Sequence, residues 1–188
     1  MKEEYLLMGK LEPTNEGYAI AKIAGLKLCE YIHRQFKKRF ICAMPATIYG
    51  PNDKFDPEVS HVLPALIIKF LEAKYNGSSS VEIWGTGNVR REFLFVEDLA
   101  DALFFLMQNY DDKSFINVGV GSDITIKQLA NEVCKLTGFG GKIKFDVTKP
   151  DGMPRKLLDT SRLKAYGWRP KVTLEEGLKR TIDWYKNL

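Results

Sequence analysis

The chain has 188 residues, of which 45% are hydrophobic and 28% charged, and its formal net charge is +4. This composition is typical of a globular protein with a core and excludes collagen-like or disordered chains, while the interspersed acidic and basic residues disfavour nucleic-acid binding. The apolar runs fall short of the roughly 18 residues that a membrane span needs, and no signal peptide is evident, so we expect a cytoplasmic protein without membrane contact.

The first third of the chain predicts a helix, a buried strand and a second helix. Thr14 and Asn15 are good N-cap residues for a helix over 16–36. Its expected apolar stripe comprises Ile20, Ile23, Ala24, Leu28 and Ile32. Residues 39–51 are nearly all apolar and end at a Gly-Pro break, which predicts one buried strand. A loop over 52–61 then leads into a helix over 62–75.

The remainder alternates strands with helices. Expected strands lie within 77–87 and over 91–96, 114–121 and 142–147. Expected helices cover 97–110, 123–140, 160–168 and 173–188, and the last one carries Thr173 and Glu176 at capping-box spacing. Residues 149–159 are expected to be a loop. Strands that alternate with helices predict the α/β class.

An α/β chain that binds a dinucleotide is expected to carry G-x-G-x-x-G between a strand and a helix. The two candidate stretches begin at Gly85 and Gly119. Arg90 and Ile124 stand where the third glycine of each should be. Neither stretch therefore fits a phosphate-binding loop of this type.

The cysteines and histidines do not form a metal-ligand pattern. Cys29, Cys42 and Cys134 are scattered without CxxC spacing, so we expect three reduced core thiols. Two histidines, His33 and His61, cannot complete a zinc site at the usual spacings. His33 is expected at the surface. Two of the tryptophans are expected in the core: Trp168 and Trp184.

Tyr18 and Lys22 are the first residues that could carry chemistry. They stand four residues apart in the first predicted helix and therefore share a face, among alanines and glycines that allow close approach. A nearby ammonium favours the phenolate and lowers a tyrosine pKa from about 10 toward neutral pH, which suits a general acid or base. The alternative is a half-buried tyrosine beside a lysine whose ammonium stays in water.

Several long segments, in order, resemble the extended short-chain dehydrogenase/reductase family of nucleotide-sugar enzymes, and within it the GDP-L-fucose synthase branch. They are NEGYAIAKIAGLKLCEYIHRQF, AMPATIYGP, SHVLPALIIKFLEA, VEIWGTGNVRREFLFVEDLADA, NVGVGSDITIKQLA and KPDGMPRKLLDTSRLKAYGWRPKVTLEEGL. The resemblance covers essentially the whole chain. It implies NADPH-dependent 3,5-epimerisation and 4-reduction of GDP-4-keto-6-deoxy-D-mannose to GDP-L-fucose.

The resemblance also implies catalytic and cofactor-binding roles. Tyr18 is similar to the tyrosine that gives a proton to the sugar oxygen, and Lys22 to the lysine that lowers its pKa and holds the nicotinamide ribose of NADP(H). His61 is similar to the acid of the epimerisation step and lies near the cofactor in the family. The strand-end residues implied beside the cofactor are Pro45, Ala46, Thr47 and Ile48. Thr47 stands where the family has asparagine, so the hydrogen bond of that amide is not available.

Five further residues match the substrate contacts of the family: Lys69, Trp84, Arg91, Asp151 and Lys156. Lys69 and Arg91 can neutralise a diphosphate, and Trp84 offers a flat face to a base or sugar ring. Asp151 can accept a hydrogen bond from a ribose or guanine donor. The alternative is a core tryptophan and solvated loop charges.

The implied fold is the C-terminal part of a Rossmann-like extended enzyme: remaining parallel strands and helices of the cofactor domain plus a smaller α/β substrate-binding domain. Residues 1–55 with parts of 90–120 would belong to the former, and residues 56–90 and 120–188 mostly to the latter. In the family a glycine-rich half, a serine and an epimerisation cysteine precede the tyrosine helix. The three cysteines here do not occupy that position.

A sheet without its first parallel strands would expose edges and an apolar face, so we expect a marginally stable or associating chain. The family commonly forms homodimers. Three alternatives to the synthase remain: a nucleotide-sugar-binding module without turnover, one half of a split enzyme, or another epimerase or dehydratase of the family.

Overall fold

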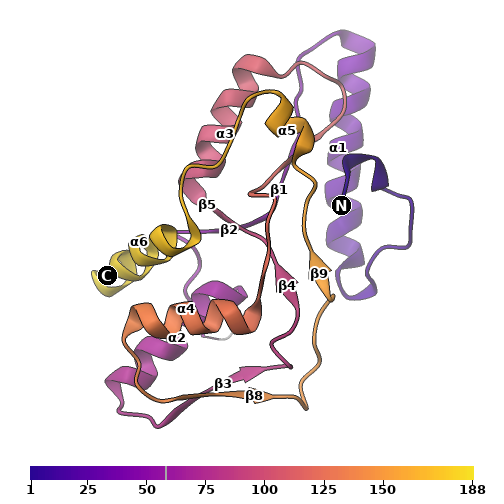
Figure 1. Cartoon of the computed structure of the whole chain (residues 1–188). Helices are drawn as coiled ribbons and strands as arrows, with labels where there is room; N and C mark the ends of the chain where they lie inside the picture. The colour runs from indigo at the N-terminus through magenta and orange to yellow at the C-terminus, as the bar shows by residue number, and fades with distance from the viewer. Residues whose placement is uncertain (58) are drawn as a thin grey trace.

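Helices and short strands alternate along the computed structural model, which describes residues 1–57 and 59–188 (Figure 1). The α-helices are α1 Glu16–Phe36, α2 Val62–Tyr75, α3 Val96–Asn109, α4 Ile126–Thr137, α5 Ser161–Ala165 and α6 Leu174–Lys186. The strands are β1 Ala43–Pro45, β2 Thr47–Tyr49, β3 Ser80–Trp84, β4 Arg90–Arg91, β5 Phe93–Phe95, β6 Ile116–Val118, β7 Ile124–Thr125, β8 Lys142–Asp146 and β9 Arg155–Lys156. Two short 3-10 turns, η1 Glu3–Tyr5 and η2 Pro13–Asn15, precede α1. The predicted α/β class is confirmed, and each predicted helix is present, although those predicted over 123–140 and 160–168 are shorter.

The single strand expected over 39–51 is wrong, because the structure divides it into β1 and β2. β1 pairs in parallel with β6, and β2 pairs in parallel with β5. Pro45, the last residue of β1, has no N–H to continue a ladder. The next residue, Ala46, donates its N–H to the carbonyl oxygen of Val118 at 2.8 Å, after which the chain changes partner.

β4, which precedes β5 in the chain, is the central strand of a small three-stranded sheet with the order β7-β4-β9. β4 is antiparallel to β7 and parallel to β9, and β9 falls in the segment expected to be a loop, so that part of the prediction is wrong. β7 lies within the helix expected over 123–140. That helix begins later because Thr125 forms a capping box with Gln128. The remaining strands, β3 and β8, form a parallel pair.

Two clusters of buried apolar side chains meet at β5. The larger cluster joins α2, α4 and α6 to β3, and the smaller one joins α3 and β6 to α5. Phe93 and Phe95 belong to the larger cluster, whereas Leu94 belongs to the smaller. Alternate residues of a strand point to opposite faces, so this one strand anchors both clusters.

The expected apolar stripe of α1 is not buried. The helix contains no buried residue, and Ile20 and Leu28 are largely exposed. Helical spacing predicts which side chains share a face but does not say what covers that face. Figure 1 shows α1 standing along one side of the fold, away from α2, α4 and α6.

Several expected burial states also differ. The three cysteines are half-buried rather than in the core, and His33 is half-buried rather than at the surface. Trp168 is buried as expected, and its indole N–H donates to Asp101. Trp184 is only half-buried, against Phe55.

Because Leu94 is fully buried at the meeting point of the two clusters, we expect Leu94→Ala to lower the free energy of unfolding by about 2–5 kcal/mol. Urea denaturation followed by circular dichroism measures this change. The matched control is Leu28→Ala on the exposed side of α1, which should stay within about 0.5 kcal/mol of the wild type. Equal effects of the two variants would contradict the observed packing.

Candidate active site

Tyr18 and Lys22 lie together near the start of α1, as their spacing predicts. The Lys22 Nζ atom is 5.6 Å from the centroid of the Tyr18 ring, within the range of a cation–π contact. Tyr18 is 62% exposed and Lys22 is also exposed. A phenol and an ammonium are therefore accessible side by side on one helix face.

Trp84 presents an exposed indole between two lysines. It is the last residue of β3 and is 66% exposed. The Nζ atoms of Lys69 and Lys149 lie 5.7 Å and 5.4 Å from its ring. Lys69 comes from α2 and also donates to the carbonyl oxygen of Glu82 at 3.1 Å. The arrangement suits a planar ring that carries phosphate nearby.

Sequence reasoning missed Lys149. It follows β8, and Trp84 is paired with Asp146 of β8 in the parallel register. That pairing brings the segment after β8 next to the end of β3. To predict this contact from the sequence, one would have to know the register between β3 and β8, which are far apart along the chain.

Asp151 holds the turn that follows Trp84. Its carboxylate accepts the backbone N–H of Thr86 at 2.9 Å and the Thr86 hydroxyl at 2.6 Å. These hydrogen bonds, the hydroxyl first, lower the pKa of Asp151. Gly85 has φ 80°, and a Cβ there would lie 2.3 Å from the Asp151 Oδ1 atom. The observed contacts of the Asp151 carboxylate therefore hold the turn after Trp84 in place.

Arg91 and Lys156 are direct partners in the register of β4 and β9. Arg91 Nη1 donates to the carbonyl oxygens of Met153 at 2.7 Å and Arg90 at 2.8 Å, and burial lowers the pKa of Arg91. Within residues 1–57 and 59–188, no ion pair joins either cation to a carboxylate. Two neighbouring cations without an ion-pair contact suit a phosphate group.

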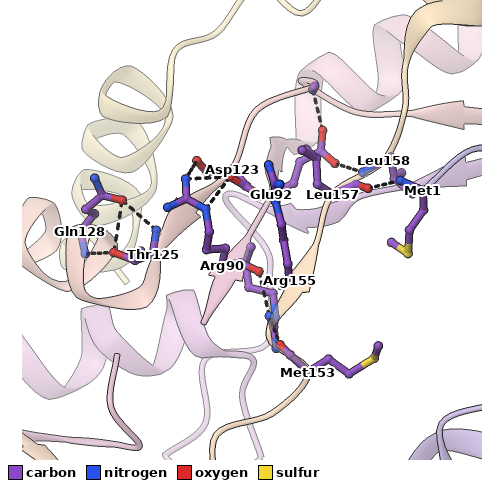
Figure 2. A network of polar contacts seen from close by, with 12 residues as sticks. Met1, Arg90, Glu92, Asp123, Thr125, Gln128, Met153, Arg155, Leu157 and Leu158 are labelled. Atoms are coloured by element: carbon purple, nitrogen blue, oxygen red, sulfur yellow. Dashed lines mark hydrogen bonds and ion pairs between the residues drawn. The ribbon is translucent and has the colours of Figure 1, made fainter. Parts of the chain in front are cut away.

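The residues that precede Arg91 and Lys156 in these strands, Arg90 and Arg155, form ion pairs with one shared carboxylate (Figure 2). Asp123 accepts Arg90 Nε at 2.8 Å on its Oδ1 atom and Arg155 Nε on its Oδ2 atom. Burial raises the pKa of Asp123, but the hydrogen bonds from Arg155 and Arg90 outweigh it, so the pKa is lowered. Nearby, the buried Glu92 accepts the backbone N–H groups of Gly121 and Leu158.

The segment that leads into α1 lies close to β9. Glu12, which precedes η2, has its pKa lowered by hydrogen bonds from Thr14 and also by the charge of Lys156. Figure 1 shows the start of α1 beside β9. The Tyr18–Lys22 pair is thus carried on the helix end nearest to the Arg91–Lys156 pair.

The other expected residues are placed separately. His61 is exposed at the N-cap of α2, and its carbonyl oxygen accepts the Ala65 N–H at 3.0 Å. Pro45 is exposed where β1 ends, and the three residues after it are half-buried. In the described part of the chain, no hydrogen bond or ion pair links His61 to Tyr18 or Lys22.

The Cys42 and Cys134 thiols are unsuited to act as bases at neutral pH. Burial, followed by contact with the Cys29 thiol, raises the pKa of Cys42 to about 11, and burial raises that of Cys134. Among residues 1–57 and 59–188, no group of three potential ligands could hold a metal ion. The same residues include no helix with the length and apolarity to cross a membrane.

Comparison with known proteins gives consistent matches. The profile of the NAD dependent epimerase/dehydratase family matches residues 1–119. GDP-L-fucose synthase 1 of Arabidopsis thaliana is 54% identical over 97% of this chain and 57% of that protein. GDP-L-fucose synthase of Escherichia coli is 47% identical over 98% of this chain and 60% of that protein. The chain thus spans less than two thirds of the curated relatives it matches.

A solved structure agrees with these matches. The GDP-L-fucose synthetase from Naegleria fowleri bound to NADP superposes with a TM-score of 0.93 at 28% identity. The superposition covers all of this chain and 60% of that one.

The raised pKa of Cys42 predicts slow alkylation at neutral pH, because the thiolate is the reactive form. We expect iodoacetamide labelling of Cys42, followed by mass spectrometry, to rise about tenfold per pH unit from pH 8 toward 11. In the urea-unfolded chain the midpoint should move to about 8.5. A midpoint below 9 in the folded chain would be inconsistent with the burial described here.

Proposed function

The chain belongs to the NAD dependent epimerase/dehydratase family, and on this basis we propose that it carries the substrate-binding residues and the catalytic tyrosine and lysine of a GDP-L-fucose synthase-type enzyme. The proposed reaction is the NADPH-dependent 3,5-epimerisation and 4-reduction of GDP-4-keto-6-deoxy-D-mannose to GDP-L-fucose. The observation that carries the proposal is the accessible Tyr18–Lys22 pair, whose Nζ atom lies 5.6 Å from the phenol ring.

The proposed substrate site combines a flat apolar surface with cations. The indole of Trp84 would stack on a ring of the GDP-sugar, with Lys69 and Lys149 at its edges. Arg91 and Lys156 would bind the diphosphate, since no ion pair in the described chain engages either of them. Asp151 would keep the turn after Trp84 in place through Thr86.

In the reduction step, the Tyr18 hydroxyl would donate its proton to the carbonyl oxygen at carbon 4 of the sugar. The Lys22 ammonium would stabilise the phenolate that remains, which makes this donation easier at neutral pH. His61 would return a proton to carbon during epimerisation. NADPH, when bound, supplies the hydride.

Residues of this chain fit the nicotinamide end of such a cofactor. Tyr18 and Lys22 are exposed on one face of α1, so a ribose can approach them. Lys22, His61 and residues 45–48 would hold it, with the Thr47 hydroxyl in the position of the family's asparagine. The smaller core cluster would belong to this cofactor-binding part and the larger one mostly to the substrate-binding part. A homodimer and a cytoplasmic location complete the proposal.

One observation favours a second candidate, a nucleotide-sugar-binding module without turnover. The stretches that begin at Gly85 and Gly119 lead into the short strands β4 and β7, not directly into a helix. A pyrophosphate is normally held where a glycine turn opens a helix. Such a module would use the proposed substrate-binding residues, and Tyr18 would have no catalytic role.

If the substrate site is correct, the chain binds GDP and Trp84→Ala lowers its affinity about tenfold, because a stacked ring contributes about 0.5–1.5 kcal/mol and the cations lose their support. Isothermal titration with GDP measures this. Tyr75→Ala, which removes another exposed aromatic ring from the end of α2, should leave the affinity unchanged. Absence of GDP binding would refute the site.

NADPH distinguishes the enzyme from the module. Oxidation of NADPH by this chain with the 4-keto sugar nucleotide, followed at 340 nm, would exclude the module, and Tyr18→Phe should reduce it by about 10²–10⁴-fold. Tyr31→Phe, an exposed tyrosine on the same helix, is the control and should retain the wild-type rate. A near wild-type rate for Tyr18→Phe would show that the assigned role is wrong. GDP-sugar binding without NADPH binding would support the module.

A further inference from the structure

The three-stranded sheet β7-β4-β9 places like charges opposite one another twice. Arg90 is paired with Arg155, and Arg91 with Lys156. Like charges directly opposite each other destabilise a sheet. Consecutive residues of a strand point to opposite faces, so each pair lies on its own side. One side contains a carboxylate and the other, among the described residues, has none in ion-pair contact.

The carboxylate is that of Asp123, which Figure 2 shows between the two arginines. Its side chain is only 3% exposed. It accepts Arg90 Nε at 2.8 Å and Arg155 Nε, and its carbonyl oxygen accepts Arg90 Nη2 at 2.9 Å. A buried carboxylate is stable only when its hydrogen bonds are satisfied. Asp123 therefore joins β4 to β9 through the two arginines.

The strands joined in this way are short. β4 and β9 have two residues each, so few ladder hydrogen bonds fix their register, and each contributes only about 0.5–1.5 kcal/mol. Asp123 is itself anchored, because the loop before it is held by the hydrogen bond from Gly121 N–H to Glu92 at 2.6 Å. The side-chain bridge is thus one restraint between β4 and β9, beside the hydrogen bonds from Arg90 N–H to Pro154 O and from Arg91 Nη1 to Met153 O.

We propose that Asp123 is a positioning residue that fixes the separation of Arg91 and Lys156 for the diphosphate of the nucleotide sugar. The inference rests on the proposed function, since it assumes that these two cations bind that group. It assigns Asp123 an effect on ligand affinity that is transmitted through Arg90 and Arg155, without contact between Asp123 and the ligand.

Because Asp123 is negatively charged, the direction of the change in GDP affinity on its replacement distinguishes the possible roles. Removal of a negative charge near a phosphate site should, on Coulomb grounds alone, strengthen the binding of an anion. Loss of positioning should weaken it, because the two cations would no longer meet the diphosphate at a fixed spacing. A stability role alone would change the melting temperature and leave the affinity of the folded chain unaltered.

The experiment compares Asp123→Asn with wild type in the full chain, using GDP titration at constant salt and the melting temperature. We expect the Kd for GDP to rise at least about fivefold. The matched control is Asp101→Asn, which also removes a carboxylate paired with a cation, Lys171, and should leave the Kd unchanged. An unchanged or lower Kd for Asp123→Asn would overturn the inference alone, whereas no GDP binding by the wild type would overturn the proposed function.

Two further variants keep the test decisive. In a Lys156→Ala background, Asp123→Asn should change the Kd less than about twofold, because the coupled partner is already gone. If Asp123→Asn does not fold, Arg155→Lys takes its place, since this exposed residue keeps its charge but loses the planar contact with Asp123. A raised Kd with an unaltered melting temperature is expected for Arg155→Lys, and an unaltered Kd would overturn the inference.

Discussion

The buried carboxylate of Glu92 is the contact on which the arrangement of the chain depends. Its residue is 2% exposed, and its oxygens accept the N–H groups of Gly121 at 2.6 Å and Leu158 at 2.9 Å. Because an unpaired buried carboxylate costs several kcal/mol, these three segments must stay together in the folded chain. Only glycine fits at position 119, where a Cβ would lie 2.4 Å from the Glu92 Oε1 atom.

Glu92 also stands between the sheet that carries the cations and the strand that anchors the core. β5 follows it directly and sends alternate side chains into the two apolar clusters, while Arg91 precedes it in β4. The proposed diphosphate site is therefore directly continuous along the chain with the buried strand β5. Tyr18 and Lys22, in contrast, lie on a helix without a buried residue, and only their local spacing keeps them together. The residues proposed for substrate binding are thus held by the core, whereas those proposed for proton transfer are held only by helical spacing.

Local signals were sufficient to predict the helices over 16–36 and 62–75 and the shared face of Tyr18 and Lys22, because capping and helical spacing act within one or two turns. Features that depend on distant pairing could not be predicted. They include the division between β1 and β2, the strand β9 and the position of Lys149 beside Trp84. The apolar stripe of α1 could be recognised in the sequence, but its exposure could not, because residue spacing does not indicate which elements pack against a helix.

Arg90 and Arg91 show that the contacts of a residue, more than its type, decide whether we assign it a structural or a binding role. They are adjacent and identical, yet strand geometry directs them to opposite sides of the same sheet. Arg90 is paired with the buried Asp123, which it shares with Arg155, whereas Arg91 bonds to backbone carbonyl oxygens and has no carboxylate in ion-pair contact among the described residues. Lys156 lies opposite Arg91 in the strand register and adds a second positive charge on that side of the sheet. The proposed diphosphate, bound between them, would offset the mutual repulsion of the two cations.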